Sequence, residues 1–214
     1  MSTPLVVVGA GGFGREVLDI VDALNRAAET VVFEIIGVLD ANPSAENLGR
    51  LSARSVRYLG TESAWRETGS RAQYLIGVGN PAARQEIDKA FTALGLTAAT
   101  VVHPAATTGS SFTVGQGSVL CGGVQVSTNV TLGRHVHLNP NSIIGHDSVL
   151  NDFVSINPSA TISGDVRIGP RSLVGAGAVV LQGLCIGADT VVGASACVTR
   201  GVGDRSVVKG IPAR

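Results

Sequence analysis

A six-residue repeat runs through the second half of the chain and limits what that half can fold into. Fifteen positions spaced six apart are all Val, Leu or Ile. They are Val114, Leu120, Val126, Leu132, Leu138, Ile144, Leu150, Ile156, Ile162, Ile168, Val174, Val180, Ile186, Val192 and Val198. The fourth residue after each is usually small or branched, so two side chains in every six are expected to face inward. This period is typical of a parallel β-helix, whose short strands turn corners and stack coil upon coil.

Glycine often follows the first inward position, as in Val114-Gly115 and Ile144-Gly145. A corner favours glycine where a side chain would obstruct the bend or where φ is positive. Hexads of this kind resemble the left-handed triangular prism, with three hexads to a coil, so residues 18 apart should stack in ladders. Seventeen hexads from 102 to 203 then make just under six coils. We therefore predict a left-handed parallel β-helix over residues 101–214.

Residues 1–100 alternate strand and helix patterns instead. Leu5–Val8 is a short apolar run that leads into a glycine-rich turn and then into apolar residues at helical spacing from Val17 to Leu24. The further predicted elements are strands at Val31–Leu39, Val56–Leu59 and Tyr74–Val78, helices at Ser63–Glu67 and Ala82–Leu94, and a loop over Asn42–Arg57. Alternating strands and helices favour a small parallel sheet. The first domain is therefore predicted to be a small Rossmann-like βαβ unit.

Composition excludes several classes of protein. The 16 basic and 16 acidic side chains cancel, which leaves no electrostatic footprint for nucleic acid or an anionic membrane. No stretch approaches the roughly 20 apolar residues of a membrane span, and the N-terminal segment lacks the basic leader of a signal peptide. The three cysteines are too few and too scattered for a disulfide framework or a CxxC zinc site. We expect a cytoplasmic protein with no nucleic-acid partner and no membrane partner.

Gly9, Gly11 and Gly14 form a GxGxxG pattern between the first strand and the first helix. Bare glycines let the backbone approach a pyrophosphate, and the helix N-terminus offers N–H donors and a partial positive charge. The alternative is a tight turn that serves only packing. Asp40, at the end of the second strand, is a candidate hydrogen-bond acceptor for a ribose or a base, or else an exposed loop carboxylate.

Histidines are the candidate catalytic groups of the second half. His146 and Asp147 are the one adjacent His/acid pair, and they follow Ile144-Gly145 at a strand edge. A histidine is a natural general base, and a neighbouring carboxylate orients it; the alternative is a solvated surface histidine. His135 and His137 form an HxH pair that is a conceivable metal site. Position 155, stacked one coil from His137, is a serine, so no third ligand lies there.

Four features together resemble the sugar acyltransferase family that includes sialic-acid O-acetyltransferases and bacterial nucleotide-4-aminosugar N-acetyltransferases. They are Val8-Gly9-Ala10-Gly11-Gly12-Phe13-Gly14-Arg15-Glu16, the hexads, Gly145-His146-Asp147 and Val208-Lys209-Gly210-Ile211-Pro212-Ala213-Arg214. The resemblance covers both halves of the chain. It implies a homotrimer with active sites between neighbouring β-helices, acetyl-CoA lying along the prism, and a nucleotide sugar held by the N-terminal domain.

The resemblance also implies roles for single residues. His146 would be the general base, with Asp147 beside it, for direct transfer of an acetyl group to a sugar amine, and no metal is expected. The nucleotide sugar would be bound by Gly9, Gly11, Gly12, Phe13, Gly14, Asp40, Gly79 and Asn80. Acetyl-CoA would be bound by Ser155, Gly164, Gly175, Ala176, Lys209 and Arg214, the last two with charges that suit its phosphates.

Three alternatives stay open. Aminosugar N-acetyltransferases of this family often carry a second histidine at the position of Ser155, so O-acetylation of a sialic-acid-like or other sugar hydroxyl is the first alternative, with His137-x-Asn139 filling the space. The second is a metal-dependent hydratase that uses His135, His137 and His146. The third is a non-catalytic nucleotide-sugar-binding protein.

Overall fold

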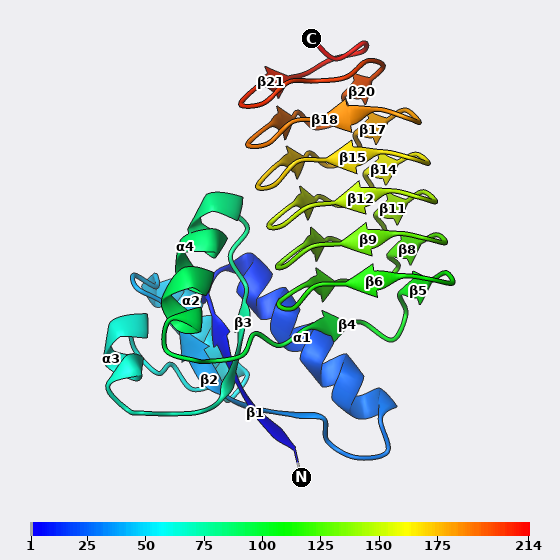
Figure 1. Cartoon of the computed structure of the whole chain (residues 1–214). Helices are drawn as coiled ribbons and strands as arrows, with labels where there is room; N and C mark the ends of the chain where they lie inside the picture. Colours follow the sequence, from blue (N-terminus) through cyan, green and yellow to red (C-terminus); the bar gives the residue numbers. More distant parts are fainter. Residues whose placement is uncertain (1) are drawn as a thin grey trace. The chain divides into compact units, whose positions relative to one another are not determined.

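The computed structural model describes residues 2–214 and divides the chain into two compact units. The first unit ends at Val101, and the second spans Val102–Arg214. Figure 1 shows the helices and the small sheet of the first unit in blue to green, and the stacked coils of the second unit in green to red. Within residues 2–214, no helix is long and apolar enough to cross a membrane.

A three-stranded parallel sheet forms the centre of the first unit, with the strand order β2-β1-β3. β1 (Thr3–Val8) leads into α1 (Gly12–Ala27), which connects it to β2 (Phe33–Leu39). β3 (Gln73–Ile76) pairs with the other edge of β1 and leads into α4 (Pro81–Thr92). The prediction of a small βαβ domain is confirmed, because consecutive parallel strands are joined by helices.

The connection after β2 differs from the prediction. The predicted loop over Asn42–Arg57 contains α2 (Ala45–Ala53). Ser44 caps this helix by accepting a backbone N–H from its first turn, and Leu51 is 1% exposed. Gly49 and the polar residues around it concealed the helix from the pattern, since glycine disfavours helix interiors.

Smaller differences concern the edges of the sheet. α3 (Glu62–Arg66) lies where a helix was predicted, but the predicted strand at Val56–Leu59 is reduced to a single bridge between Tyr58 and Val38. β2 and β3 are both shorter than predicted. Element ends are set by pairing with neighbouring strands, which apolar runs alone do not specify.

The core of the first unit is aromatic. Phe91 from α4 stacks on Trp65 from α3 with ring centroids 5.7 Å apart, and it tilts against Tyr74 from β3 at 4.8 Å. All three rings are buried, and the Tyr74 hydroxyl donates to the buried Asp88 carboxylate at 2.5 Å. Buried aromatic pairs of this geometry are stabilising beyond the area they bury. They hold α3 and α4 against the sheet.

Two-residue strands build the second unit as three parallel sheets. The first sheet contains β4 (Val101–Val102), β7 (Val119–Leu120), β10 (His137–Leu138), β13 (Ser155–Ile156), β16 (Leu173–Val174), β19 (Val191–Val192) and β21 (Val207–Val208). The second contains β5 (Thr107–Thr108), β8 (Gln125–Val126), β11 (Ile143–Ile144), β14 (Thr161–Ile162), β17 (Val179–Val180) and β20 (Cys197–Val198). The third contains β6 (Thr113–Val114), β9 (Thr131–Leu132), β12 (Val149–Leu150), β15 (Arg167–Ile168) and β18 (Cys185–Ile186).

Neighbouring strands in these sheets pair with the predicted shift of 18 residues. His137 pairs with Ser155 and Leu138 with Ile156, in parallel register. Every repeat position from Leu120 to Val198 is buried, whereas Val114 near the start is 37% exposed. Burial of a branched side chain at every sixth residue stabilises each coil through the hydrophobic effect. The predicted left-handed parallel β-helix of about six coils is confirmed.

At the corners of the β-helix, the residues with positive φ are different from the glycines that follow the strands. Positive φ recurs every six residues, for example at Asn129 (58°), Asn141 (60°) and Asp147 (62°). The glycines that follow the strands do not have positive φ. At Gly145 an added Cβ would instead lie 2.5 Å from the backbone nitrogen of Gly164 on the next coil. Close stacking of coils, and not the sign of φ, therefore requires these glycines.

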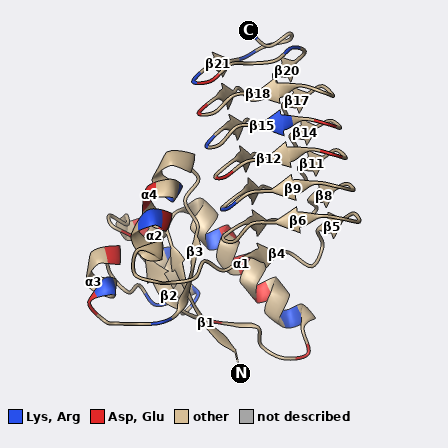
Figure 2. Ribbon diagram, in the orientation of Figure 1, with Lys and Arg blue, Asp and Glu red and all other residues tan. Residues whose placement is uncertain are grey.

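Charged side chains are sparse on the β-helix. Figure 2 shows that they lie mainly at the turns between strands, although β15 carries Arg167. One corner pair is bidentate, because Arg171 donates to both carboxylate oxygens of Asp189 at 2.6 Å. The two residues are 18 apart, so this ion pair joins successive coils.

Candidate active site

A histidine and a carboxylate lie together at an exposed corner of the β-helix. β11 ends at Ile144, and His146 and Asp147 follow in the turn. Asp147 has a φ of 62°, a left-handed conformation that Asn, Asp and Gly tolerate best. The side chains of His146 and Asp147 are 61% and 51% exposed. The pair is therefore accessible to a substrate.

The imidazole is oriented by a chain of hydrogen bonds. Nδ1 of His146 lies 2.7 Å from Oδ2 of Asp147, and Oδ1 of Asp147 accepts the Asn129 amide at 3.0 Å. The hydrogen bonds from His146 and then from Asn129 lower the pKa of the Asp147 carboxyl. Asp147 is therefore ionised at neutral pH and can only accept hydrogen bonds. When the imidazole is neutral, its proton therefore lies on Nδ1, and Nε2 is free to act as a base.

Asn129 is a residue that the motif search missed. It lies on the coil before Asp147, exactly one 18-residue period earlier, and it has the same left-handed backbone conformation. The period alone is a signal that points to it, because residues 18 apart stack at the same corner.

Gly164 lies against the other edge of the imidazole. A Cβ added to it would be 2.5 Å from both Cε1 and Nε2 of His146. Gly164 belongs to the coil that follows the His146 coil, so the histidine ring extends over it. The glycine predicted to contact acetyl-CoA is thus in contact range of the candidate base.

The other two histidines of the proposed metal set are buried. His135 has no exposed surface, and its ring stacks on Phe153 with centroids 5.5 Å apart. His137 is 1% exposed and pairs with Ser155 in the ladder, as predicted. Within residues 2–214, no group of three or more His, Cys, Asp or Glu side chains is arranged to hold a metal ion. Among the described residues of this chain, His135, His137 and His146 therefore do not form the three-histidine centre that the hydratase alternative requires.

Two of the residues considered for acetyl-CoA, Gly175 and Lys209, lie on coils that are separated by the coil of Gly193. A Cβ at Gly175 would meet the backbone of the next coil, beside Gly193, at 2.5 Å, and a Cβ at Gly193 would meet Cβ of Lys209 at 3.0 Å. Gly175 is buried, so the next coil fills the space that its side chain would take. Lys209 and Arg214 exchange backbone hydrogen bonds of 3.0 and 3.2 Å, so two exposed cationic residues are adjacent near the C-terminus. The remaining predicted residues are the exposed Ala176 and the 2% exposed Ser155.

The glycine turn of the first unit is closely packed at some residues and open at others. A Cβ at Gly14 would overlap the carbonyl oxygen of Gly9, and a Cβ at Gly9, whose φ is 112°, would lie 2.7 Å from the carbonyl oxygen of Gly77. Gly11 and Gly12, at the start of α1, have no neighbour within 4 Å of an added Cβ. Packing therefore requires Gly9 and Gly14, while Gly11 and Gly12 leave the helix N-terminus open to a ligand.

Asp40 is attached to this turn and is not a free loop carboxylate. Its Oδ2 accepts the Ala10 N–H and its Oδ1 accepts the Asn42 N–H, each at 2.8 Å. Asp40 therefore joins the end of β2 to the glycine turn, with one hydrogen bond on each oxygen. A carboxylate has about four acceptor sites, so this does not exhaust its capacity for a ligand. Phe13, the other non-glycine residue of the predicted set in this region, is half-buried.

A buried arginine that the sequence reasoning did not single out donates hydrogen bonds to the backbone of the turn after β3. Asn80 caps α4 by accepting the Ala83 N–H at 3.0 Å, and Gly79 before it is exposed. The buried Arg84 donates to the carbonyl oxygens of Val78 and Gly79 at 3.1 and 3.0 Å. Burial lowers the pKa of Arg84 to about 9. An arginine in a helix usually faces solvent, so no pattern in the sequence indicated this role.

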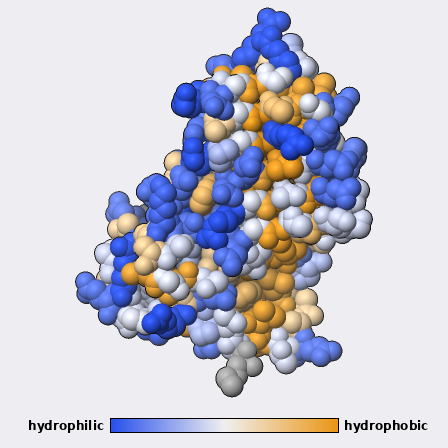
Figure 3. All heavy atoms as spheres, in the orientation of Figure 1, coloured by the Kyte–Doolittle hydropathy of each residue, from blue (hydrophilic) through white to orange (hydrophobic). Residues whose placement is uncertain are grey.

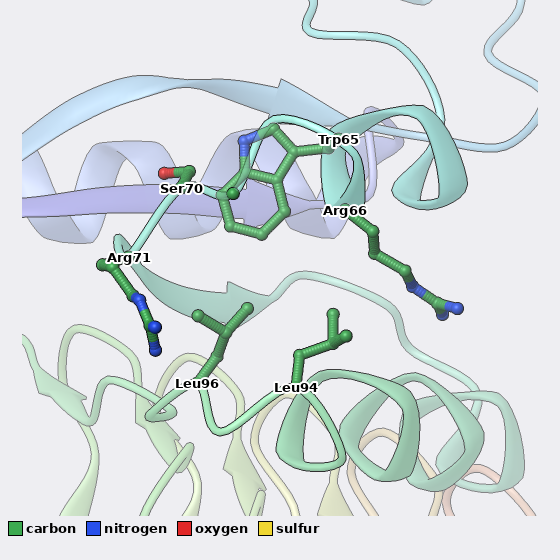
Figure 4. A pocket seen from close by; sticks show the side chains of 7 residues that line it. Trp65, Arg66, Ser70, Arg71, Leu94 and Leu96 are labelled. Carbon is green, nitrogen blue, oxygen red and sulfur yellow. The ribbon is translucent and has the colours of Figure 1, made fainter.

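Two hollows adjoin these elements. One of about 470 Å³ lies beside the start of α1, and its lining comprises Gly12, Arg15, Glu16, Asp19, Arg50, Ala53 and Arg54. A second, of about 170 Å³, lies where the side chains of Trp65, Leu94 and Leu96 converge, with Arg66 pointing outward (Figure 4). None of the predicted site residues lines the second cavity. The first adjoins the open part of the glycine turn, and two of its three arginines, Arg50 and Arg54, form ion pairs with carboxylates.

Comparison with known proteins identifies similar chains for both units. Residues 4–91 match the PglD N-terminal domain family. GDP-perosamine N-acetyltransferase from Escherichia coli O157:H7 is 28% identical over 141 residues, which make up 66% of this chain and 61% of that protein. The matched part thus spans less than two thirds of the length of this relative.

Solved structures are similar along nearly the whole chain. A histidine-to-asparagine mutant of perosamine N-acetyltransferase from Caulobacter crescentus, in complex with CoA and GDP-perosamine, is 27% identical with a TM-score of 0.86, covering 99% of this chain and 95% of that one. The acetyltransferase domain of PglB from Neisseria gonorrhoeae FA1090 is 29% identical with a TM-score of 0.86, covering 100% and 99%. The expected resemblance to sugar acyltransferases is confirmed for both units.

Proposed function

We propose that this protein transfers the acetyl group of acetyl-CoA to the amine of a nucleotide-linked aminosugar, with His146 as the general base. One observation carries the proposal: Oδ2 of Asp147 lies 2.7 Å from Nδ1 of the exposed His146 imidazole and so leaves Nε2 for a substrate, in a fold similar to those of sugar N-acetyltransferases. A general base must be accessible and must present an unprotonated atom to the group it deprotonates. His146 meets both conditions.

The reaction would proceed in one transfer step. The sugar amine attacks the thioester carbonyl carbon, Nε2 of His146 takes the amine proton, the C–S bond breaks, and CoA leaves with its thiol reprotonated. Asp147 stabilises the imidazolium that forms, as carboxylates do beside catalytic histidines. Because the transfer is direct, it requires no acyl-enzyme intermediate on a cysteine. Acetyl-CoA would pass the exposed Ala176 and reach Lys209 and Arg214, two adjacent exposed cations whose charges suit its phosphates.

The first unit would bind the nucleotide of the sugar donor. The open backbone at Gly11 and Gly12 lies at the N-terminus of α1, where N–H donors and the helix dipole attract phosphate. Asp40 and Asn80 shape the turns at the carboxyl ends of β2 and β3, which is where ligands bind in open parallel sheets. Phe13, Gly9, Gly14 and Gly79 complete the proposed site.

A homotrimer is part of this proposal. Ile143 is 39% exposed only three residues before His146, and Figure 3 shows hydrophobic residues gathered over the strands of the β-helix on the face in view. Packing against a neighbouring copy would bury such a face and enclose the site. A cytoplasmic location suits the three free cysteines, because a reducing compartment keeps thiols from forming disulfides.

Release of CoA thiol tests the activity directly. The purified protein is given acetyl-CoA and, in turn, GDP-, UDP- and dTDP-linked 4-aminosugars and free sialic acid. We expect release with one aminosugar nucleotide, and a rate about 10²–10⁴-fold lower for His146→Ala. The matched control is His103→Ala, on the first coil, where His103 Nδ1 only accepts the Ala105 N–H.

The other outcomes each refute part of the proposal. Release with sialic acid alone would establish O-acetylation instead. Binding of a sugar nucleotide without thiol release from acetyl-CoA or longer acyl-CoA would favour a non-catalytic binding protein. Wild-type turnover in His146→Ala would refute the assignment of the base.

A further inference from the structure

Three successive coils meet at the corner that carries His146. The 18-residue period places Thr128 and Asn129 before His146 and Asp147, and Gly164 after them. Asn129 contacts the carboxylate side of the pair, and Gly164 lies at the Nε2 edge of the ring. The imidazole therefore has a defined neighbour on each side of its own coil.

Asn129 holds the carboxylate in place. Its amide donates to Oδ1 of Asp147, while Oδ2 faces Nδ1 of His146. The φ of 58° at Asn129 is one that Asn, Asp and Gly adopt readily. Its amide donor can therefore be removed or exchanged without distorting the corner, which makes the interaction testable.

Hydrogen bonds on either side of Gly164 hold its backbone against the coil of His146. On one side of it, the carbonyl oxygen of Ser163 accepts the hydroxyl of Ser148 at 3.1 Å, and on the other the Asp165 N–H donates to the carbonyl oxygen of His146 at 2.7 Å. The three atoms nearest to a Cβ added here all belong to the His146 ring, at 2.5 Å for Cε1 and Nε2 and 3.0 Å for Cδ2. The ring is the part that would have to shift.

We propose that Asn129 and Gly164 are positioning residues that hold His146 in one orientation and one tautomer: Asn129 by fixing the carboxylate that receives Nδ1–H, and Gly164 by leaving Nε2 uncovered. The catalytic consequence rests on the proposed acetyl transfer, but the orientation of the ring does not. Gly164 thereby acquires a role that differs from direct contact with acetyl-CoA.

The two roles of Gly164 predict different kinetics. If Gly164 positions His146, Gly164→Ala lowers kcat about 10–100-fold, the order expected for a displacement of about 1 Å, and changes KM for acetyl-CoA less than twofold. If it only contacts acetyl-CoA, KM rises and kcat is kept. Gly203→Ala is the control, because a Cβ there has no neighbour within 4 Å. In the His146→Ala background, Gly164→Ala should have no further effect on the residual rate, since the ring it displaces is absent.

Histidine NMR tests the orientation without any substrate. Ring ¹⁵N shifts of His146, assigned with His146→Ala, report the tautomer and the pKa. We expect the Nδ1–H tautomer in the wild type. Asn129→Asp removes the donor and adds a negative charge beside the Asp147 carboxylate, which favours the imidazolium, so the midpoint of the His146 titration should move to higher pH. The acid limb of kcat/KM against pH should move upward by the same amount.

The control must add the same charge elsewhere. The ionisable groups at this corner of the three coils are Asp147, in contact with the ring, and Asp165, beside Gly164; Thr128 and Asn129 are neutral. Asn141→Asp adds an equal charge at another corner with the same backbone conformation, φ 60°. It should leave the His146 titration unchanged.

Two results would overturn the proposal. One is an identical His146 titration in Asn129→Asp and Asn141→Asp, together with an unchanged tautomer in Gly164→Ala. The other is a further loss of rate when Gly164→Ala is added to His146→Ala. If no acceptor sugar is acetylated at all, the proposed function fails, while the NMR titrations still decide whether the two residues position the ring.

Discussion

Replacing Gly14 by alanine should destabilise the first unit even though alanine is the better helix former. Gly14 lies in the first turn of α1, where alanine in place of glycine contributes up to about 1 kcal/mol of helix propensity. Against this, the new Cβ would overlap the carbonyl oxygen of Gly9. Overpacking costs about 1–3 kcal/mol, and the upper end applies because the overlapped atom is backbone and cannot rotate away.

The net loss is about 2 kcal/mol, since the overlap outweighs the propensity. Gly12→Ala is the matched control, because the same substitution in the same helix meets no atom within 4 Å. In Gly12→Ala only the higher helix propensity of alanine has an effect, so the stability of this variant should equal or exceed that of the wild type. The two variants therefore differ in the sign of their effect.

The fluorescence of Trp65 reports the stability of the first unit alone. Such a local probe is needed because the unfolding of a chain with two units need not be two-state. Trp65 is the single tryptophan of the chain, it lies in the first unit, and it is 5% exposed. Its fluorescence during urea unfolding should show a midpoint about 1–2 M lower for Gly14→Ala, for a slope of about 1–2 kcal/mol/M. A midpoint equal to that of Gly12→Ala would refute the packing argument.

Two further predictions concern hydrogen bonds and charge. Tyr74→Phe removes the donor to the buried Asp88 and should cost the first unit about 1–3 kcal/mol, again read from Trp65 fluorescence; an unchanged midpoint would mean that Asp88 is fully satisfied without it. The hydrogen bond from Arg171 lowers the pKa of Asp189, so the ion pair stabilises the fold above the ordinary carboxyl pKa and this contribution is lost as the pH falls through the lowered value. Asp189→Asn should melt at a lower temperature than the wild type at pH 7, and the difference should shrink as the pH falls below about 4; a difference that does not depend on pH would contradict this.

Much of the candidate site was accessible from the sequence. The pair His146-Asp147 stands out because it is the one adjacent His/acid pair, and the hexad register alone places it at a strand edge. The same register predicts its neighbours, since residues 18 positions away stack on it. Asn129 and Gly164 were therefore within reach of the sequence, although nothing in the residues themselves indicated which neighbour would donate a hydrogen bond and which would only make room.

Other features could not be inferred from local patterns. The helix α2 was concealed by a central glycine, and the buried Arg84 is indistinguishable in sequence from a solvated helix arginine. The formation of α2 and the burial of Arg84 both depend on which other residues of the first unit pack against them. Asp40 is similar, because its binding to the Ala10 N–H requires that two strand ends lie side by side.

The sequence by itself determined the fold of the repeating half of this protein. Burial of two residues in every six is a short-range pattern, and the β-helix buries both of them in every coil. Only the tertiary structure decided what each glycine and each corner side chain does. The atom that a new Cβ would meet belongs to another coil, as at Gly145 and Gly164, or to a distant part of the first unit, as at Gly77, where it is Cα of Gly14 in α1. The reason is physical: composition and period report which side chains avoid water, whereas steric overlap and hydrogen bonding depend on positions to within an ångström.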